Sequence, residues 1–219
     1  MIQVFARKQF KRQVVYIPNG AQPQTVTDAG ELAGFGLEPQ GYLLNVSRLV
    51  PHKGQHYLIE AYKRLPKTLR EQYALTIVGA PAYTEEYLTR LKDLAGGDPN
   101  ILFLGYQSGE ALAQLFAHAA LFIQPSESEG LPVVVLEAMS YGTPVLVSDI
   151  AENLEVIHHA GFSFKTTDVD DLTAKLEELI QNPDRLAASG GQARDVIRRY
   201  FSWDAIAQQT EEVYRTVRH

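Results

Sequence analysis

Two carboxylates that flank an apolar run are the most informative feature of this sequence. Glu129 and Glu137 lie on either side of a segment that begins Gly130-Leu131-Pro132. A helix that only fills a core needs no glutamate at either position, whereas a pocket that holds a sugar and a ribose by their hydroxyl groups can use both, because carboxylates accept hydrogen bonds. Proline is tolerated in the first turn of a helix. The segment therefore predicts a helix with Glu129 just before it and Glu137 two turns in.

Two cations stand in a second segment, upstream of these carboxylates. Arg48 and Lys53 lie in a run that ends at Gly54. Arginine offers phosphate a planar fork and lysine a compact charge. Together they would neutralise a diphosphate, including the charge that grows on it as it leaves. The free N–H groups at a helix start favour phosphate oxygens as well. Carboxylates for hydroxyls and cations for a diphosphate together predict a site for a nucleotide sugar.

Short apolar segments alternate with segments of helical periodicity along the chain. Strands are predicted at residues 14–17, 42–46, 75–78, 101–104, 121–124 and 145–147. Helices are predicted at residues 54–65, 84–95, 109–118, 131–141, 170–181, 183–199 (interrupted near Gly190-Gly191) and 204–217, the last with Ser202 as a nearby N-cap. Continuous apolar strands are typical of a parallel sheet buried on both faces. The alternation predicts one α/β domain, a Rossmann-like open parallel sheet flanked by helices, with a helical C-terminal extension.

The predicted strands bring the polar segments together. Ligands of open α/β sheets bind beyond the carboxyl ends of the strands. Four of the predicted strands are followed by polar or glycine positions: Arg48, Gly79, Gly105-Tyr106-Gln107 and Pro125-Ser126. Four segments that are distant in the sequence are therefore expected to meet at one edge of the sheet.

Composition excludes several other classes of function. The net charge of −6 and the pI of about 5.5 give no basic field for nucleic acid. The absence of cysteine excludes disulfides, thiol catalysis and cysteine-based zinc sites. No apolar run approaches the ~20 residues of a membrane-spanning helix. The basic run 7–12 is interpreted as a solvated helix face rather than a membrane contact.

The sequence lacks the motifs of several cofactor and metal sites. Neither the glycine pattern of nicotinamide-binding proteins nor a Walker lysine motif is present. The six histidines have no metal-binding spacing. Asp168-Val169-Asp170 has the Asp-x-Asp pattern of metal-dependent sugar transferases, but it precedes helix 170–181 and is interpreted as favourable charge at a helix start. No metal site is predicted.

Taken together, these segments resemble glycosyltransferase family 4 (group 1), a family of retaining sugar transferases with the two-domain GT-B fold. The matching segments are residues 16–20, 47–54, 103–106, 125–126, 129–132, 137–139, 142–145 and 148–153. Ala21-Gln22 departs from the Val-Asp that is usual in the family after Ile-Pro-Asn-Gly.

The resemblance implies a function for each site residue. Arg48 and Lys53 would hold the donor diphosphate, and Glu137 the ribose hydroxyls. Glu129, with Gly130 and Leu131, would contact the donor sugar near the reacting carbon. Tyr106 and Gln107 would lie near the base. Glu129, Arg48 and Lys53 would be the catalytic residues of a metal-independent transfer of a hexose, with retention, from a UDP- or GDP-linked donor and with no other cofactor.

The resemblance also implies a division of the chain. Residues 1–18 would be the end of a first GT-B domain and its crossover strand, 19–200 the nucleotide-sugar-binding domain, and 201–219 a helix that packs on the first domain. This chain is therefore expected to be the C-terminal half, inactive alone, with the N-terminal domain supplied in cis or in trans and with self-association through its exposed cleft surface. A cytoplasmic location, peripheral at the inner membrane face, follows from the family.

Two alternatives of other classes stay open. The first is a nucleotide-sugar epimerase of similar fold, which a product assay would distinguish from a transferase. The second is a non-catalytic interaction module, since a fold does not fix a function.

Overall fold

A six-stranded parallel sheet forms the centre of the computed structural model, which describes residues 2–11 and 14–217. The strands are β1 (Tyr42–Val46), β2 (Ala74–Val78), β3 (Ile101–Gly105), β4 (Leu121–Gln124), β5 (Val145–Ser148) and β6 (Phe162–Phe164). Their order is β3-β2-β1-β4-β5-β6. Strands β1 to β5 confirm the five strands predicted between residues 42 and 147. β6 was not predicted, because three residues are too few to establish a period.

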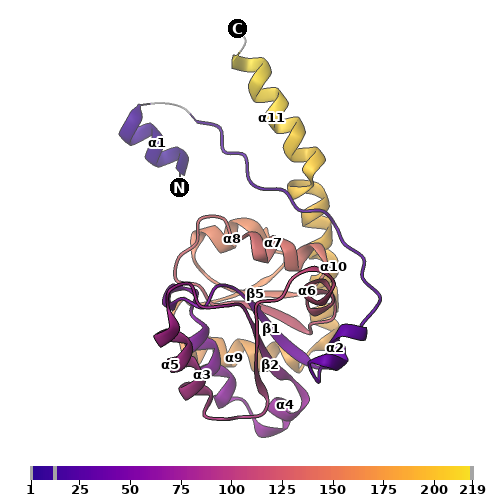
Figure 1. Cartoon of the computed structure of the whole chain (residues 1–219). Helices are drawn as coiled ribbons and strands as arrows, with labels where there is room; N and C mark the ends of the chain where they lie inside the picture. The colour runs from indigo at the N-terminus through magenta and orange to yellow at the C-terminus, as the bar shows by residue number, and fades with distance from the viewer. Residues whose placement is uncertain (1, 12–13, 218–219) are drawn as a thin grey trace.

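The apolar strands pack against helices on both faces of the sheet (Figure 1). In β1, Leu43 contributes to one hydrophobic cluster and Leu44 to the other, and neither side chain is accessible to solvent. Leu146 and Val147 divide in the same way in β5. Successive side chains of a strand point to opposite faces, so a strand covered twice needs apolar residues throughout. This burial explains the continuous apolar runs of the sequence.

The helices are α1 (Ile2–Phe10), α2 (Gly30–Gly34), α3 (Gln55–Arg64), α4 (Lys67–Gln72), α5 (Glu85–Ala95), α6 (Gly109–Ala117), α7 (Val133–Ser140), α8 (Ala151–Ile157), α9 (Val169–Ile180), α10 (Pro183–Val196) and α11 (Trp203–Val217), with a 3-10 helix η1 (Pro51–Lys53) and a π-helix η2 (Ile197–Phe201). Helix α3 packs against α5 and α9 on one face of the sheet, whereas α7 packs against α6, α8 and α10 on the other. α2, α4 and α8 are short and were not predicted.

Side-chain caps fix the starts of two helices, of which the sequence predicted the cap at Ser202 and, at Asp168, only favourable charge. The Asp168 carboxylate accepts a hydrogen bond from the backbone N–H of Asp171 at 2.9 Å and so caps α9. The Ser202 hydroxyl accepts one from Ala205 N at 3.2 Å, at the start of α11. Capping satisfies an N–H group that has no partner inside the helix. The Asp-x-Asp pattern at residue 168 therefore belongs to a helix start, as predicted.

The predicted strand at residues 14–17 is wrong. These residues form no strand of the sheet, and Val15 is 64% exposed. An apolar run forms a strand only where a partner strand supplies hydrogen bonds, and this segment runs away from the sheet (Figure 1). Residues 1, 12 and 13 of the predicted 1–18 unit lie outside the described residues, as do 218 and 219 of the 201–219 unit.

The predicted interruption of the helix at Gly190-Gly191 is also wrong. α10 is continuous through both glycines. A Cβ atom added to Gly190 would lie 2.2 Å from the carbonyl oxygen of Gly142, at the end of α7, whereas one at Gly191 would meet nothing within 4 Å. Gly190 therefore permits close packing of α10 on α7 rather than breaking the helix.

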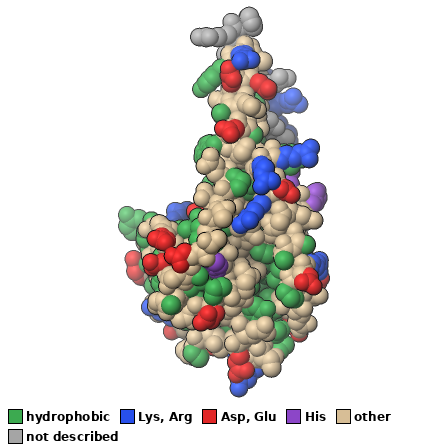
Figure 2. Space-filling view, turned by 90° about the vertical axis from the view of Figure 1, so that its right-hand side faces the viewer, with side chains coloured by type: hydrophobic (Ala, Val, Ile, Leu, Met, Phe, Trp, Pro, Cys, Tyr) green, Lys and Arg blue, Asp and Glu red, His purple; other side chains and the backbone are tan. Residues whose placement is uncertain are grey.

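The chain ends in a helix that projects from the domain (Figures 1 and 2). Trp203, at the base of α11, packs over Gly20, and the N–H of Ala21 donates to Phe201 O at 2.7 Å. The extended segment before α2 thus runs against the start of the C-terminal helix. Among the described residues, no helix has the length and apolar character needed to cross a membrane.

We predict opposite effects for alanine at the two glycines of α10. Gly190→Ala should lower the free energy of unfolding by about 1–3 kcal/mol, because the new methyl group overlaps a carbonyl oxygen that cannot rotate away. Gly191→Ala should raise it by about 0.5–1 kcal/mol, because alanine has a smaller backbone entropy loss in a helix. Urea denaturation measures both variants. Equal effects would contradict the close contact between α10 and α7.

Candidate functional site

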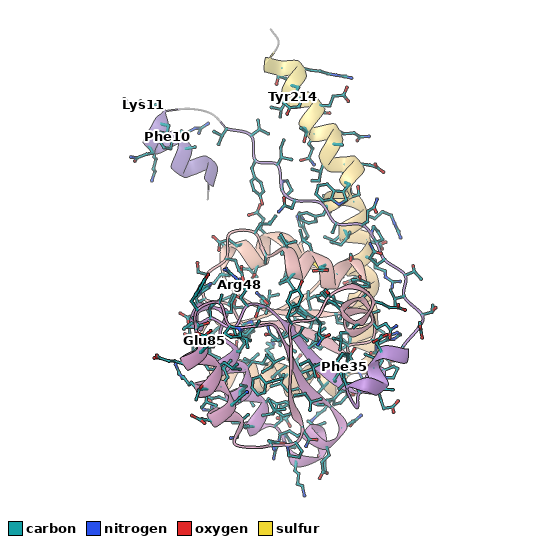
Figure 3. The ribbon with its side chains drawn as sticks, viewed as in Figure 1. Phe10, Lys11, Phe35, Arg48, Glu85 and Tyr214 are labelled. Carbon is teal, nitrogen blue, oxygen red and sulfur yellow. The ribbon has the colours of Figure 1, made fainter. Side chains whose placement is uncertain are left out.

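A cavity of about 570 Å³ opens at the carboxyl ends of β1, β2 and β3, beside the start of α7. The predicted site residues that line it are Arg48, Lys53, Tyr106, Gln107, Glu129 and Leu131. Figure 3 shows Arg48 on the same side of the domain as Glu85 at the start of α5, with Phe35 near α2 on the opposite side. The strand order reverses between β1 and β4, which makes this edge the switch point of the sheet.

Two of the predicted site residues are not part of the cavity lining. Gly130 lies between the lining residues Glu129 and Leu131. Glu137 is on α7, which begins at Val133, so it stands about 6 Å along the axis, one turn rather than two turns into the helix. Glu137 is half-buried, and burial raises the pKa of its carboxyl group. Its contact with a ribose stays a prediction.

Glu129 is held by three side chains. Lys53 Nζ lies 2.7 Å from each of its carboxylate oxygens. Gln124 Nε2 and Ser126 Oγ each donate to Oε1 at 2.6 Å. The side chains of Lys53 and Glu129 are 13% and 6% exposed, so the pair is largely shielded from water. The sequence predicted that both residues would reach one site, but it did not predict that they would pair.

The buried side chain of Gln55 holds the loop after β1 in place. Gln55 Nε2 donates to Ser47 Oγ at 2.7 Å and to the Arg48 carbonyl at 2.9 Å. Tyr87 in turn donates its hydroxyl to Gln55 Oε1 at 3.1 Å, and burial raises the pKa of Tyr87 to about 12. The Arg48 side chain itself is exposed, and no acidic group in the described part of the chain forms an ion pair with it. The backbone of Arg48 is thus held while its guanidinium group is left available.

Two glycines bring neighbouring loops into contact under the cavity. At Gly54 φ is 72°, and an added Cβ would lie 2.0 Å from the carbonyl oxygen of Pro125 after β4. At Gly79, φ is 143° and the Cβ would lie 1.9 Å from Ser47 O. Only glycine allows both the backbone angle and the close approach. These contacts place Lys53, directly before Gly54, beside the β4 loop that carries Glu129.

The loop after β3 forms the rim of the cavity. Gly105 has a positive φ of 66°, and the pairing of β2 with β3 shifts register at Ile77/Val78. Gln107 Nε2 donates to the carbonyl oxygen of Leu104 at 2.7 Å, which fixes the turn. Tyr106 remains 74% exposed at the rim. An open aromatic ring at this place could stack on a base.

Sequence reasoning missed Gln55 and Gln124 as parts of the site. Both side chains are fully buried, Gln55 at the start of α3 and Gln124 at the end of β4, whose other residues are apolar. A polar residue at the end of an apolar strand was a usable signal, since buried amides require hydrogen-bond partners. Within the described residues, no group of three or more His, Asp or Glu side chains is placed to share a metal ion.

The architecture and the position of the cavity define the class of protein: an α/β domain with a Rossmann-like parallel sheet, of the kind found in GT-B folds. The structure of HepE from Anabaena, solved in complex with UDP and glucose, superposes with a TM-score of 0.77 at 25% identity, over 87% of this chain and 53% of HepE. The sucrose-phosphate synthase of Thermosynechococcus elongatus has a TM-score of 0.83 at 24% identity, over 99% of this chain and 56% of the synthase.

The family model "Glycosyl transferases group 1" matches residues 35–196, and this chain belongs to that family. O-antigen chain mannosyltransferase B of Escherichia coli is 32% identical over 186 residues, which are 84% of this chain and 48% of that enzyme. D-inositol 3-phosphate glycosyltransferase of Gordonia bronchialis is 35% identical over 168 residues, 73% of this chain and 36% of that enzyme. The chain thus spans about half or less of the length of these relatives.

We predict that the close contact at Gly54 supports the cavity. Gly54→Ala should cost about 1 kcal/mol for its left-handed backbone and a further 1–3 kcal/mol for the overlap with Pro125 O. Gly97 is a matched control: its φ is also 72°, but an added Cβ meets nothing within 4 Å. Thermal denaturation of both variants gives the cost of the overlap with Pro125 as the difference between their losses of stability. A cost at Gly54 no larger than that at Gly97 would contradict the close approach of the two loops.

We predict a pH-dependent stability effect at Glu137. Because burial raises the pKa of this carboxyl group, the folded state retains a proton that the unfolded state has lost. Its contribution to stability therefore falls as the pH rises from the ordinary pKa of glutamate to the raised value. Glu137→Gln should be more stable than the wild type at pH 7, and the gain should shrink under acid conditions. Denaturation at several pH values tests this, with the exposed Glu86→Gln controlling for charge removal; a gain that grows in acid would contradict it.

Proposed function

We propose that this chain is the donor-binding domain of a family 4 glycosyltransferase that transfers a hexose with retention, and without a metal, from a UDP- or GDP-linked donor. The observation that carries the proposal is the shared cavity: Arg48, Lys53 and Glu129 line it together at the switch point of the sheet. Among similar proteins, a mannosyltransferase from Corynebacterium glutamicum is named GDP-mannose-dependent, and HepE was solved with UDP and glucose. These names support a nucleotide-sugar donor without choosing the base.

In this proposal the two cations act on the leaving group. As the bond between the anomeric carbon and the diphosphate oxygen breaks, negative charge grows on the diphosphate. Arg48 would bind it with its fork and Lys53 with its ammonium group, which must then turn from Glu129. The acceptor oxygen forms its bond on the same face of the sugar, and its proton passes to the leaving phosphate oxygen. Glu129 would contact the sugar hydroxyls through Oε2, because Oε1 already accepts three hydrogen bonds.

The remaining parts of the donor have candidate positions on the same edge. Glu137 would accept the two ribose hydroxyls, and Tyr106 and Gln107 at the rim would lie beside the base. The acceptor would be bound by a further domain, in cis or in trans, to which the additional length of the relatives corresponds. We propose that transfer requires this domain and that the chain alone binds the donor without transferring it.

Calorimetric titration with UDP, GDP, ADP and their common sugar conjugates tests the proposal. One nucleotide series should bind saturably, and Arg48→Ala should weaken binding by roughly 10- to 100-fold, as expected for hydrogen bonds to a charged group. Arg48→Lys should recover part of the loss, because it keeps the charge but not the fork.

Lys67→Ala is the matched control for this titration. It removes one positive charge from α4, which precedes β2 and so lies at the amino ends of the strands. It should leave the affinity unchanged. Failure of every nucleotide to bind, or equal losses at Arg48 and Lys67, would overturn the proposed donor site.

A further inference from the structure

A fully buried amide lies directly against the Glu129 carboxylate. Gln124 is the last residue of β4, and neither its side chain nor that of Ser126 is accessible to solvent. Gln124 Nε2 donates to Ser126 Oγ at 2.8 Å and to Glu129 Oε1 at 2.6 Å. Ser126 Oγ donates to the same carboxylate oxygen. The carboxylate therefore has two uncharged donors in addition to Lys53.

The orientation of the Gln124 amide is set by this contact. Its carbonyl oxygen Oε1 is buried and has no hydrogen-bond partner among the described residues. Leaving a buried acceptor without a partner is unfavourable. The reversed amide would place that oxygen against a carboxylate oxygen, where two acceptors repel. The favourable contact with Glu129 thus outweighs the unsatisfied carbonyl group.

The two oxygens of the Glu129 carboxylate accept different numbers of hydrogen bonds. Oε1 accepts from Lys53, Gln124 and Ser126, whereas Oε2 accepts only from Lys53. When Lys53 moves to a phosphate, Oε2 becomes free for a ligand hydroxyl, and Gln124 and Ser126 still hold Oε1. Without Gln124, only Ser126 would remain as a donor to the buried carboxylate once Lys53 moves away. The carboxylate would then hold the lysine more strongly.

We propose that Gln124 is a positioning residue, which holds the Glu129 carboxylate in place and thereby releases Lys53 to bind the donor diphosphate. This inference rests on the proposed function. Gln124 lies outside the cavity lining, and its effect on diphosphate affinity is transmitted through Glu129. Because Gln124 does not line the cavity, its effect is expected to be indirect.

A double-mutant cycle between Gln124 and Glu129 tests the inference. Gln124→Met keeps the length of the side chain and removes both donated hydrogen bonds. In the wild-type background it should weaken binding of the preferred nucleoside diphosphate by roughly three- to tenfold, about the net effect of one ordinary hydrogen bond, because the loss reaches the diphosphate only through Glu129 and Lys53. In the Glu129→Gln background, Lys53 is already free, so Gln124→Met should change the affinity by less than about twofold.

A matched control excludes a general packing effect. Gln114 is also buried, and its side chain accepts from Glu31 N at 2.8 Å, apart from the cavity lining. Gln114→Met should lower the thermal stability without changing the nucleotide affinity. If it weakens binding as much as Gln124→Met does, the effect is structural and the inference is overturned.

Thermal denaturation of the ligand-free chain supplies a second readout that needs no nucleotide. The shifts in Tm for Gln124→Met and Glu129→Gln should be non-additive, because the two residues share a hydrogen bond. Additive shifts in Tm would contradict the contact between Gln124 and Glu129. Equal affinity losses for Gln124→Met in the wild-type and Glu129→Gln backgrounds would contradict the effect of Gln124 on Lys53. If the wild-type chain binds no nucleoside diphosphate, the proposed function fails and this inference fails with it, whereas the Tm cycle still reports on the contact alone.

Discussion

The close approach of the loops after β1, β2 and β4 is the constraint on which the site depends. Gly54 lies against the Pro125 carbonyl and Gly79 against the Ser47 carbonyl, at distances where no side chain would fit. Because the loops touch, Lys53 from one and Glu129 from another form a shielded ion pair. A charge pair in such surroundings needs further hydrogen bonds, since its desolvation is costly. Gln124 and Ser126 provide them.

The site combines fixed and available groups. The backbone of Arg48 is held by Gln55, while its guanidinium group is exposed. Glu129 has one oxygen saturated by the protein and one that depends on Lys53 alone. Such an arrangement keeps the positions of the charges while it leaves their remaining hydrogen bonds for a ligand. Preorganised groups of this kind lower the cost of ordering the site when a ligand binds.

The second structural requirement is the packing of α10 on α7. Gly190 lets α10 approach the carbonyl oxygen of Gly142, and Arg194 Nη2 donates to Tyr141 O at 2.7 Å. α7 is the helix whose start borders the cavity and whose first turns carry Glu137. The C-terminal helices therefore support the site from behind, through the end of α7, although they supply none of its lining residues.

The sequence by itself determined the parallel sheet, since strands covered on both faces must be apolar throughout, and each strand except β6 had a sufficient run. It also determined that Arg48, Lys53 and Glu129 would meet, because the carboxyl ends of parallel strands share one edge. Only the tertiary structure decided that Lys53 pairs with Glu129, that Gln124 and Gln55 support them, and that Gly190 continues a helix. It likewise placed Glu137 outside the cavity lining and residues 14–17 outside the sheet. These outcomes depend on distances between segments far apart in the chain, which local periodicity and residue type do not encode.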